Sequence, residues 1–256
     1  MQGRFTVYFQ PKIEMESGGL VGAEALVRGL DAQGGVIPPA QFIEGMEKSG
    51  EIRELDLFVM ERALSYLEHW REEGHELVPV SINFSRTTLL NPTSPAAALA
   101  LKSHYPQLSE ELLMIEITET AGDVGEETLS DAMNRFRQFG FRFALDDFGS
   151  RYANLSIFSN VKFNEIKLDR SLIRDLPGNP ISRTLVQDIA RICRDEGMRC
   201  VAEGVETEKQ RQILIEAGCR CAQGYYYDRP MPAAMFESKY LNSRNGEQET
   251  GGMSCD

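Results

Sequence analysis

The segment LLMIEI at residues 112–117 decides the fold class when it is taken together with the two segments after it. This short apolar run predicts a buried strand. The next segment, EETLSDAMNRFRQF at residues 126–139, has its apolar residues at helical spacing, and FRFAL at residues 141–145 predicts a second strand. A strand, a helix and a strand joined by short links form a unit in which the two strands run parallel.

The same alternation extends in both directions along the chain. Towards the C-terminus we expect strands at residues 165–168, 198–202 and 219–226 and helices at residues 181–195, 208–217 and 232–241. Towards the N-terminus we expect a strand at residues 78–83 and helices at residues 52–71 and 95–104. These units suffice to close a sheet, so the predicted fold is α/β, a TIM-like (β/α)8 barrel.

The first two strands depart from the parallel pattern. Residues 5–13 and 20–28 are apolar runs joined across Ser17-Gly18-Gly19, which predicts a hairpin. We therefore expect one antiparallel strand near the N-terminus of the barrel. We expect a single domain over residues 1–242. Residues 243–256 are polar, rich in glycine and without periodicity, which predicts a disordered tail.

Composition limits the function classes. The chain has 256 residues, 42% of them hydrophobic and 26% charged, which is typical of a globular protein. The net charge of −12 disfavours broad binding to a nucleic-acid polymer or an anionic membrane, but it allows a small anionic ligand held by metal ions. Five cysteines without paired spacing are typical of a reducing compartment, so we expect a cytoplasmic protein. Its full-length parent could still be anchored to a membrane.

The polar residues are informative because nearly every expected strand carries one close to its C-terminal end. They are Glu24, Asn83, Glu116, Asp146, Asp147, Lys167, Glu203 and Gln223. In a parallel barrel these strand ends meet at one rim, where barrel active sites lie. A single acidic residue after a strand is usually a helix cap or a solvated loop residue. Five carboxylates at one rim would instead repel each other strongly unless cations compensate them.

The donor types indicate which cation. Carboxylate and amide oxygens are hard ligands, so they favour Mg²⁺ or Mn²⁺ over zinc. The adjacent Asp146 and Asp147 would allow one carboxylate to bridge two ions, the arrangement used in phosphoryl chemistry. None of the three histidines lies near a strand end, which disfavours a histidine-based metallohydrolase. Asp147-Phe148-Gly149 matches a kinase tripeptide, but no glycine-rich phosphate loop accompanies it.

With these motifs in place, the chain resembles the EAL-domain family, the bacterial phosphodiesterases of cyclic di-GMP. The resemblance extends from Tyr8 to about Leu241. The motifs that carry it are Phe9-Gln10-Pro11, Glu24-Ala25-Leu26-Val27-Arg28, Ser81-Ile82-Asn83, Ile115-Glu116-Ile117-Thr118-Glu119, Asp146-Asp147-Phe148-Gly149, Ile166-Lys167-Leu168-Asp169, Ala202-Glu203-Gly204-Val205-Glu206 and Gln223-Gly224-Tyr225.

The resemblance implies a function and its partners. It implies hydrolysis of cyclic di-GMP to linear pGpG, two Mg²⁺ or Mn²⁺ ions as cofactors, a barrel with one reversed strand, and a homodimer. A sensor or GGDEF-type domain could precede this part in a longer parent chain. Two alternatives stay open: a catalytically weak receptor that binds cyclic di-GMP without hydrolysing it, and a barrel metalloenzyme for another phosphodiester.

The resemblance also assigns roles to residues. One ion would be held by Glu24, Asn83, Glu116 and Asp146, and the other by Asp146 and Asp147, with Glu203 and Gln223 supporting it directly or through water. The implied catalytic residues are Lys167, which would contact the attacking water, together with Glu24 and Glu203. The implied substrate contacts are Gln10, Leu26, Arg28 and Asp169. Glu119 and Glu206 resemble residues that support the ligands and the loop after the aspartate pair.

The loop after the aspartate pair departs from the family pattern. The family has Gly-x-Gly-Tyr-Ser-Ser at the place where this chain has Gly149-Ser150-Arg151-Tyr152-Ala153-Asn154. Glycine allows backbone conformations that Arg151 tolerates poorly, and the lost hydroxyls remove hydrogen bonds that could anchor the loop. This difference predicts reduced or differently regulated activity, and harmless drift of the loop sequence is the alternative.

Overall fold

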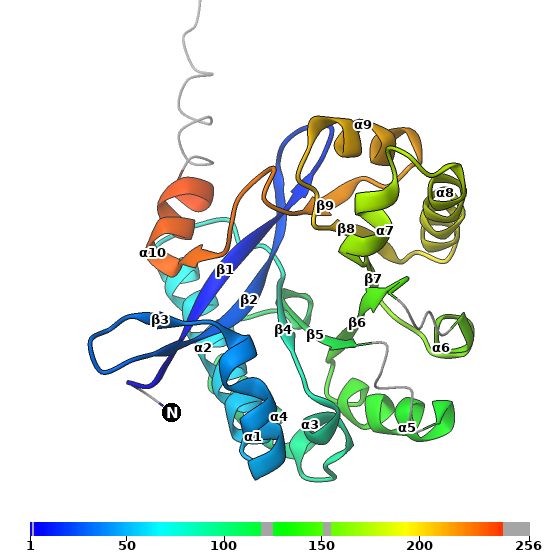
Figure 1. Cartoon of the computed structure of the whole chain (residues 1–256). Coiled ribbons are helices and arrows are strands. Elements are labelled where there is room, and N and C mark those ends of the chain that lie inside the picture. Colours follow the sequence, from blue (N-terminus) through cyan, green and yellow to red (C-terminus); the bar gives the residue numbers. More distant parts are fainter. Residues whose placement is uncertain (2, 119–124, 151–154, 243–256) are drawn as a thin grey trace, which may run out of the picture.

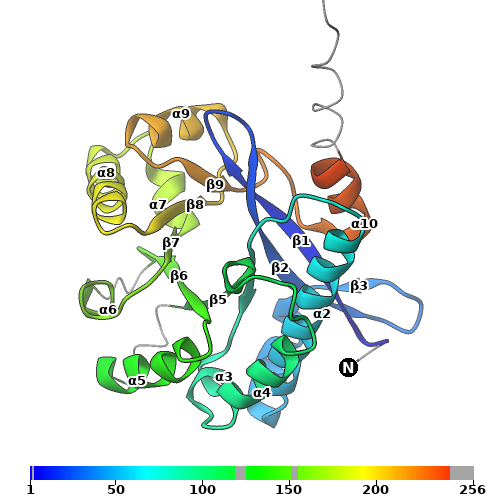
Figure 2. The same ribbon diagram turned by 180° about the vertical axis from the view of Figure 1, so that it is seen from behind.

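A closed ring of strands forms the centre of the protein in the computed structural model (Figures 1 and 2). The structure describes residues 1, 3–118, 125–150 and 155–242. The expected tail at residues 243–256, together with Glu119 and Arg151, lies outside the described residues. Within the described part, the sheet order is β10-β1-β9-β8-β7-β6-β5-β4-β2-β3, and an additional pairing of β1 with β2 closes eight of these strands into a barrel.

The strands of the barrel confirm the predicted α/β architecture and its one reversed strand. Strand β1 runs antiparallel to its two neighbours in the barrel, β2 and β9, whereas the other neighbouring barrel strands pair in parallel. The barrel strands are β1 (Phe5–Glu14), β2 (Leu20–Leu30), β4 (Val80–Asn83), β5 (Leu113–Thr118), β6 (Arg142–Phe148), β7 (Glu165–Leu168), β8 (Arg199–Glu203) and β9 (Cys221–Gln223). Two short strands, β3 (Val36–Ile37) and β10 (Met231–Pro232), extend the sheet outside the ring.

Helices surround the ring on its outside (Figure 1). The long ones are α2 (Ile52–Glu72), α5 (Glu126–Arg137) and α8 (Pro180–Asp195). The shorter ones are α1 (Ile43–Ser49), α3 (Arg86–Leu90), α4 (Ser94–Lys102), α6 (Leu155–Asn160), α7 (Arg170–Asp175), α9 (Glu208–Glu216), α10 (Ala233–Phe236) and the turns η1 (Pro39–Gln41), η2 (Glu110–Leu112) and η4 (Glu237–Leu241). No described helix combines the length and the hydropathy that crossing a bilayer requires.

The boundaries differ from the sequence prediction mainly at the last barrel strand. The predicted strand at residues 219–226 is only Cys221–Gln223. It ends there because the chain turns: the Tyr226 N–H donates to the Val205 carbonyl at 2.9 Å, and the Tyr227 N–H donates to the Gly224 carbonyl at 3.1 Å. A Cβ atom at Gly224 would lie 2.2 Å from the Val205 carbonyl oxygen, so only glycine fits this close approach.

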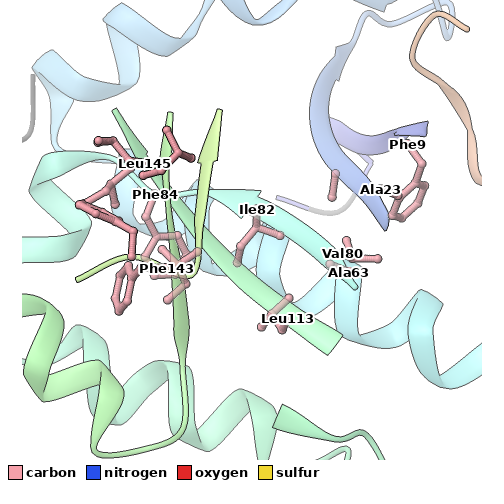
Figure 3. Packing of buried hydrophobic residues seen from close by; sticks show 14 of the residues in the cluster. Phe9, Ala23, Ala63, Val80, Ile82, Phe84, Leu113, Phe143 and Leu145 are labelled. Carbon is pink, nitrogen blue, oxygen red and sulfur yellow. The ribbon is translucent and has the colours of Figure 1, made fainter. Parts of the chain in front are cut away.

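The hydrophobic core lies between the barrel and its helices. Residues on alternate positions of the strands point outward, and these positions carry Phe9, Ala23, Val80, Ile82, Leu113, Phe143 and Leu145, all of them buried. Figure 3 shows these side chains on neighbouring strands, together with Ala63 of α2. Burying apolar area in this layer supplies the main favourable contribution to folding.

The inside of the barrel is polar by contrast. Side chains of Lys12 on β1 and Glu116 on β5 touch, although these strands are not neighbours in the sheet. Such contacts are possible only across the interior of the ring. Gln10, Glu24, Lys167 and Gln223 are likewise buried and bonded to one another or to other polar groups. The alternation of side chains along each strand therefore separates an apolar outer face from a charged inner one.

Candidate active site

Lys167 stands at the centre of the polar side chains at the barrel mouth. Its side chain is 1% exposed, and its ammonium Nζ lies within 3.2 Å of four carboxylates from four different strands. The distances are 3.2 Å to Glu24 Oε2, 2.6 Å to Glu116 Oε2, 3.0 Å to Asp146 Oδ1 and 2.8 Å to Glu203 Oε1. The structure thus brings the predicted rim acids together around one cation.

Two amide side chains hold Glu24, one at each carboxylate oxygen. Asn83 Nδ2 on β4 donates to Glu24 Oε1 at 2.8 Å, and Gln223 Nε2 on β9 donates to Glu24 Oε2 at 2.6 Å. Gln223 Nε2 also donates to Gln10 Oε1 at 2.9 Å, and Gln10 Nε2 donates to the Asp228 carbonyl at 3.0 Å. Gln10 and Glu24 face each other in the register of β1 and β2. These bonds fix the orientation of the Glu24 carboxylate.

A second group of acids consists of Asp146, Asp147 and Glu203. One ligand atom from each lies within 4.8 Å of the others, a spacing that can hold a metal ion. Asp147 has a φ of 57°, and it is the only non-glycine residue with positive φ in the described part of the chain. Positive φ is uncommon for residues other than glycine, and residues in such conformations are concentrated at functional sites. The Asp147 N–H also donates to Asp146 Oδ1 at 3.0 Å.

Charge and burial act in opposite directions on these groups. Burial would lower the pKa of Lys167, but the carboxylates of Asp146, Glu116, Glu203 and Glu24 outweigh burial and raise that pKa well above its usual range. Lys167 is therefore an ammonium at neutral pH. Burial raises the pKa of Glu203 to about 7 and also raises that of Asp146. The acids of the mouth thus exceed what one lysine can neutralise.

The residues present fit divalent metal ions. The donors at the mouth are carboxylate and amide oxygens, which suit Mg²⁺ or Mn²⁺. Gln223 Oε1 is buried and accepts no hydrogen bond from the described residues, although buried amide oxygens rarely stay unpartnered. The raised pKa of Asp146 and of Asp147, where burial is the largest cause, indicates that these carboxylates need further positive charge to stay ionised together. The unpartnered oxygen and the excess of acids are both satisfied by bound cations.

A cavity of about 230 Å³ opens beside these groups. Its lining includes the predicted residues Gln10, Glu24, Leu26, Asp147, Asp169, Glu203, Glu206 and Gln223. Asp169 also caps α7, because its Oδ1 accepts the Ser171 N–H at 2.9 Å. Arg28 does not line this cavity. Its Nη1 donates to the Val27 carbonyl at 2.8 Å, and its guanidinium lies 5.4 Å from the centre of the Tyr8 ring.

The structure adds residues to which the sequence assigns no role. Arg170 and Tyr225 line the same cavity, and the Tyr225 side chain is stacked by the Arg229 guanidinium at 4.1 Å. Leu26 also lines a second cavity of about 220 Å³, and the buried carboxylate of Asp56 is part of the lining of this second cavity. Tyr225 follows the predicted Gln223, so its place at the mouth could have been expected from the sequence. Asp56 lies on helix α2, and a pattern of polar residues at strand ends cannot identify a residue on a helix.

Comparison with known proteins gives the family. The EAL domain family matches residues 1–230. The cyclic di-GMP phosphodiesterase RocR of Pseudomonas aeruginosa is 33% identical over 238 residues, which cover 91% of this chain and 59% of RocR. The chain spans only 31% and 29% of two further curated relatives.

Solved structures agree with this result. The PaMucR phosphodiesterase in complex with c-di-GMP superposes with a TM-score of 0.83 and 28% identity, over 91% of this chain and 94% of that one. The manganese and cyclic di-GMP complex of Klebsiella pneumoniae BlrP1 gives a TM-score of 0.79 and 25% identity, over 90% of this chain and 57% of that one. The family match covers most of the chain and the barrel closes as in these structures, so the chain belongs to the EAL domain family.

Proposed function

We propose that this chain hydrolyses cyclic di-GMP to linear pGpG with the help of two Mg²⁺ or Mn²⁺ ions. The observation that carries the proposal is the gathering of Glu24, Glu116, Asp146 and Glu203 around one buried ammonium, with Asp147 beside them. Relatives named as cyclic di-GMP phosphodiesterases support the substrate. The reaction adds water across one phosphodiester of the ring, so one P–O ester bond breaks and the product keeps one terminal phosphate.

In this proposal the oxygens of Glu24, Asn83, Glu116 and Asp146 would hold one ion. Asp146 and Asp147 would hold the other, supported by Glu203 and Gln223 directly or through water. Bound ions would lower the pKa of a coordinated water and offset the charge that develops on the phosphate. The residues themselves orient the reacting groups. Lys167 donates hydrogen bonds but accepts no proton, because its pKa is raised far above neutral. It would therefore orient the attacking water and stabilise negative charge rather than act as a general base.

The lining of the cavity beside the acids supports the proposed substrate contacts. Gln10 offers an amide and Leu26 an apolar side chain to a ligand there, and Asp169 and Arg170 line its edge. The resemblance to the family position implies that Arg28 contacts a phosphate oxygen, and its guanidinium has N–H donors besides the one bonded to the Val27 carbonyl. The homodimer, an adjoining sensor or GGDEF-type domain and a cytoplasmic location stay predictions from the family resemblance.

The test is a turnover assay in which cyclic di-GMP and pGpG are separated by chromatography. We expect turnover that depends on Mg²⁺ or Mn²⁺. In Glu24→Gln the turnover should fall on the order of 10²–10³-fold, which is the loss typically measured when one group that stabilises the charge of the transition state is removed. Asp131→Asn, at an exposed position of α5, is the matched control and should keep full activity. Calorimetric binding of cyclic di-GMP without any product would reject hydrolysis and support the receptor alternative.

A further inference from the structure

Lys12 is a buried cation that the proposed function does not use. It lies on β1, two residues after Gln10, and it is 2% exposed. Its Nζ is 2.9 Å from Glu116 Oε1 and 2.6 Å from Glu165 Oε1, and both of these carboxylates are buried. Burying an ammonium is costly unless it is paired at such distances, so the position calls for an explanation.

The register of the strands places Lys12 one layer deeper in the barrel than the mouth. Gln10 faces Glu24 across β1 and β2, and Lys12 faces Gly22, which precedes Glu24 by two residues. A Cβ atom at Gly22 would lie 3.5 Å from Lys12 Cδ and 3.2 Å from the Pro79 carbonyl oxygen. The tighter approach is to the Pro79 carbonyl, whereas the Lys12 side chain lies at ordinary van der Waals distance from this position.

Glu116 is held between two ammonium groups as a result. Its Oε1 contacts Lys12 below the mouth, and its Oε2 contacts Lys167 at the mouth, 2.6 Å away. Burial alone would raise the pKa of Glu116, but the charges of Lys12 and Lys167 together outweigh burial and lower that pKa to about 2. The carboxylate is thus ionised and has one oxygen fixed at each level of the barrel.

Glu165 completes the arrangement on the deeper level. It lies on β7, two residues before Lys167, so both side chains point into the barrel. Its second oxygen, Oε2, lies 3.5 Å from Arg199 Nη1 on the neighbouring strand β8. Lys12 and Glu165 together add no net charge to the interior, and their contact fixes the Lys12 ammonium beside Glu116 Oε1.

We propose that Lys12, anchored by Glu165, is a positioning residue that holds Glu116 so that its other oxygen is presented to a divalent ion at the mouth. This inference rests on the proposed function, because it assigns Glu116 as an ion ligand. Groups that orient metal ligands from behind are typically worth 10–100-fold in metal affinity or activity. Lys12 does not touch the substrate cavity, so nucleotide binding should not depend on it.

Removing Lys12 alone would mix two opposite effects. Loss of a positive charge beside the acids would strengthen cation binding, whereas loss of the contact to Glu116 would weaken it. The double variant Lys12→Met/Glu165→Gln removes one charge of each sign and leaves the net charge unchanged. Replacing both partners of a buried pair is also tolerated far better than removing one. Lys12→Gln/Glu165→Gln is the substitute if the first double variant does not fold.

The experiment is a calorimetric titration of Mn²⁺ into the nucleotide-free protein, followed by kcat and KM for cyclic di-GMP at fixed Mn²⁺. We expect the Mn²⁺ dissociation constant to rise about 10-fold or more in the double variant, kcat to fall, and KM to stay unchanged. The matched control is Lys48→Met/Glu44→Gln, which removes an exposed ion pair on α1 and should change none of these values.

Two outcomes would overturn the inference in distinguishable ways. If the wild type binds Mn²⁺ and the folded double variant binds it equally well with the same kcat, Lys12 only fills the barrel and the positioning role is wrong. If the wild type itself binds no Mn²⁺, the proposed function fails and this inference fails with it.

Discussion

The two faces of the barrel strands differ in chemistry and in their contribution to stability. The outer face packs Phe9, Ile82 and Phe143 against helices and carries no charge at these positions, whereas the inner face carries Glu24, Lys167 and other ionised groups. The apolar layer is favourable wherever it is buried. Burying the charged groups of the inner face costs free energy, and the ion pairs around Lys167 and Lys12 offset this cost. Stability therefore resides mainly outside the ring, and the capacity for chemistry resides inside it.

Truncating the apolar layer should have the largest effect on stability. Phe143→Ala removes a side chain that is 0% exposed, so we expect the free energy of unfolding in denaturant to fall by about 3–5 kcal/mol. The kcat of the folded fraction should stay unchanged, because Phe143 points away from the mouth. Phe143→Leu is the control and should lose less. A drop in kcat without a loss of stability would contradict the division between the two faces.

Removing divalent ions should affect the inner face alone. Ions that bind only the native state raise the free energy of unfolding by about 4 kcal/mol at 1,000 times their dissociation constant. We expect a chelator to remove this increment and all turnover, while circular dichroism stays native because Lys167 and the amides of Asn83 and Gln223 still hold the acids. Phe143→Ala should show the same ion-dependent increment. Loss of the native spectrum upon chelation would mean that the ions are part of the fold.

Asp56 should show the smallest effect of the three. It is a buried carboxylate beside the apolar layer, and among the described residues no lysine is paired with it. It is 7% exposed, and Asp56 Oδ2 accepts from the Ser85 N–H at 2.8 Å and from Thr88 Oγ1 at 2.6 Å. Burial raises its pKa to about 6, from 3.8. The folded state therefore binds the proton more tightly than the unfolded state.

The sign of the pH effect follows from that difference. The contribution of Asp56 to stability is complete below about pH 4 and is lost as the pH rises through 6. Relative to Asp56→Asn, the wild type should lose no more than about 3 kcal/mol of unfolding free energy between pH 4 and pH 7. Denaturant unfolding of both proteins at several pH values measures this. Parallel pH profiles would show that Asp56 stays ionised in spite of its burial.

The strand-end pattern predicted most of the mouth correctly. Glu24, Asn83 and Glu116 follow or end short apolar runs, and parallel strands must bring such residues to one rim. The pattern could not give the contacts of Lys167, because its distance to four acids depends on the closure of the ring. It also did not predict that Arg28 bonds to the backbone of its own strand, since a side-chain rotamer is chosen by local packing.

Residues from helices and from deeper layers escaped the prediction. Asp56 belongs to a helix, which the strand-end pattern does not cover. Lys12 lies two residues before the end of β1, but this strand is antiparallel to its neighbours, so its C-terminal end points away from the mouth. Several short elements, among them α1 and α7, were also missed. They span seven and six residues, which is too short for a periodic pattern to be distinguished from a loop.

The sequence by itself determined the class of fold, the reversed first strand and the set of acids at the strand ends. These features depend on local periodicity and chain order, which any stretch of residues carries with it. Only the tertiary structure decided that Lys167 stands among four carboxylates and that Lys12 holds Glu116 from below. Both contacts join strands that are far apart in the chain, so they exist only once the ring has closed.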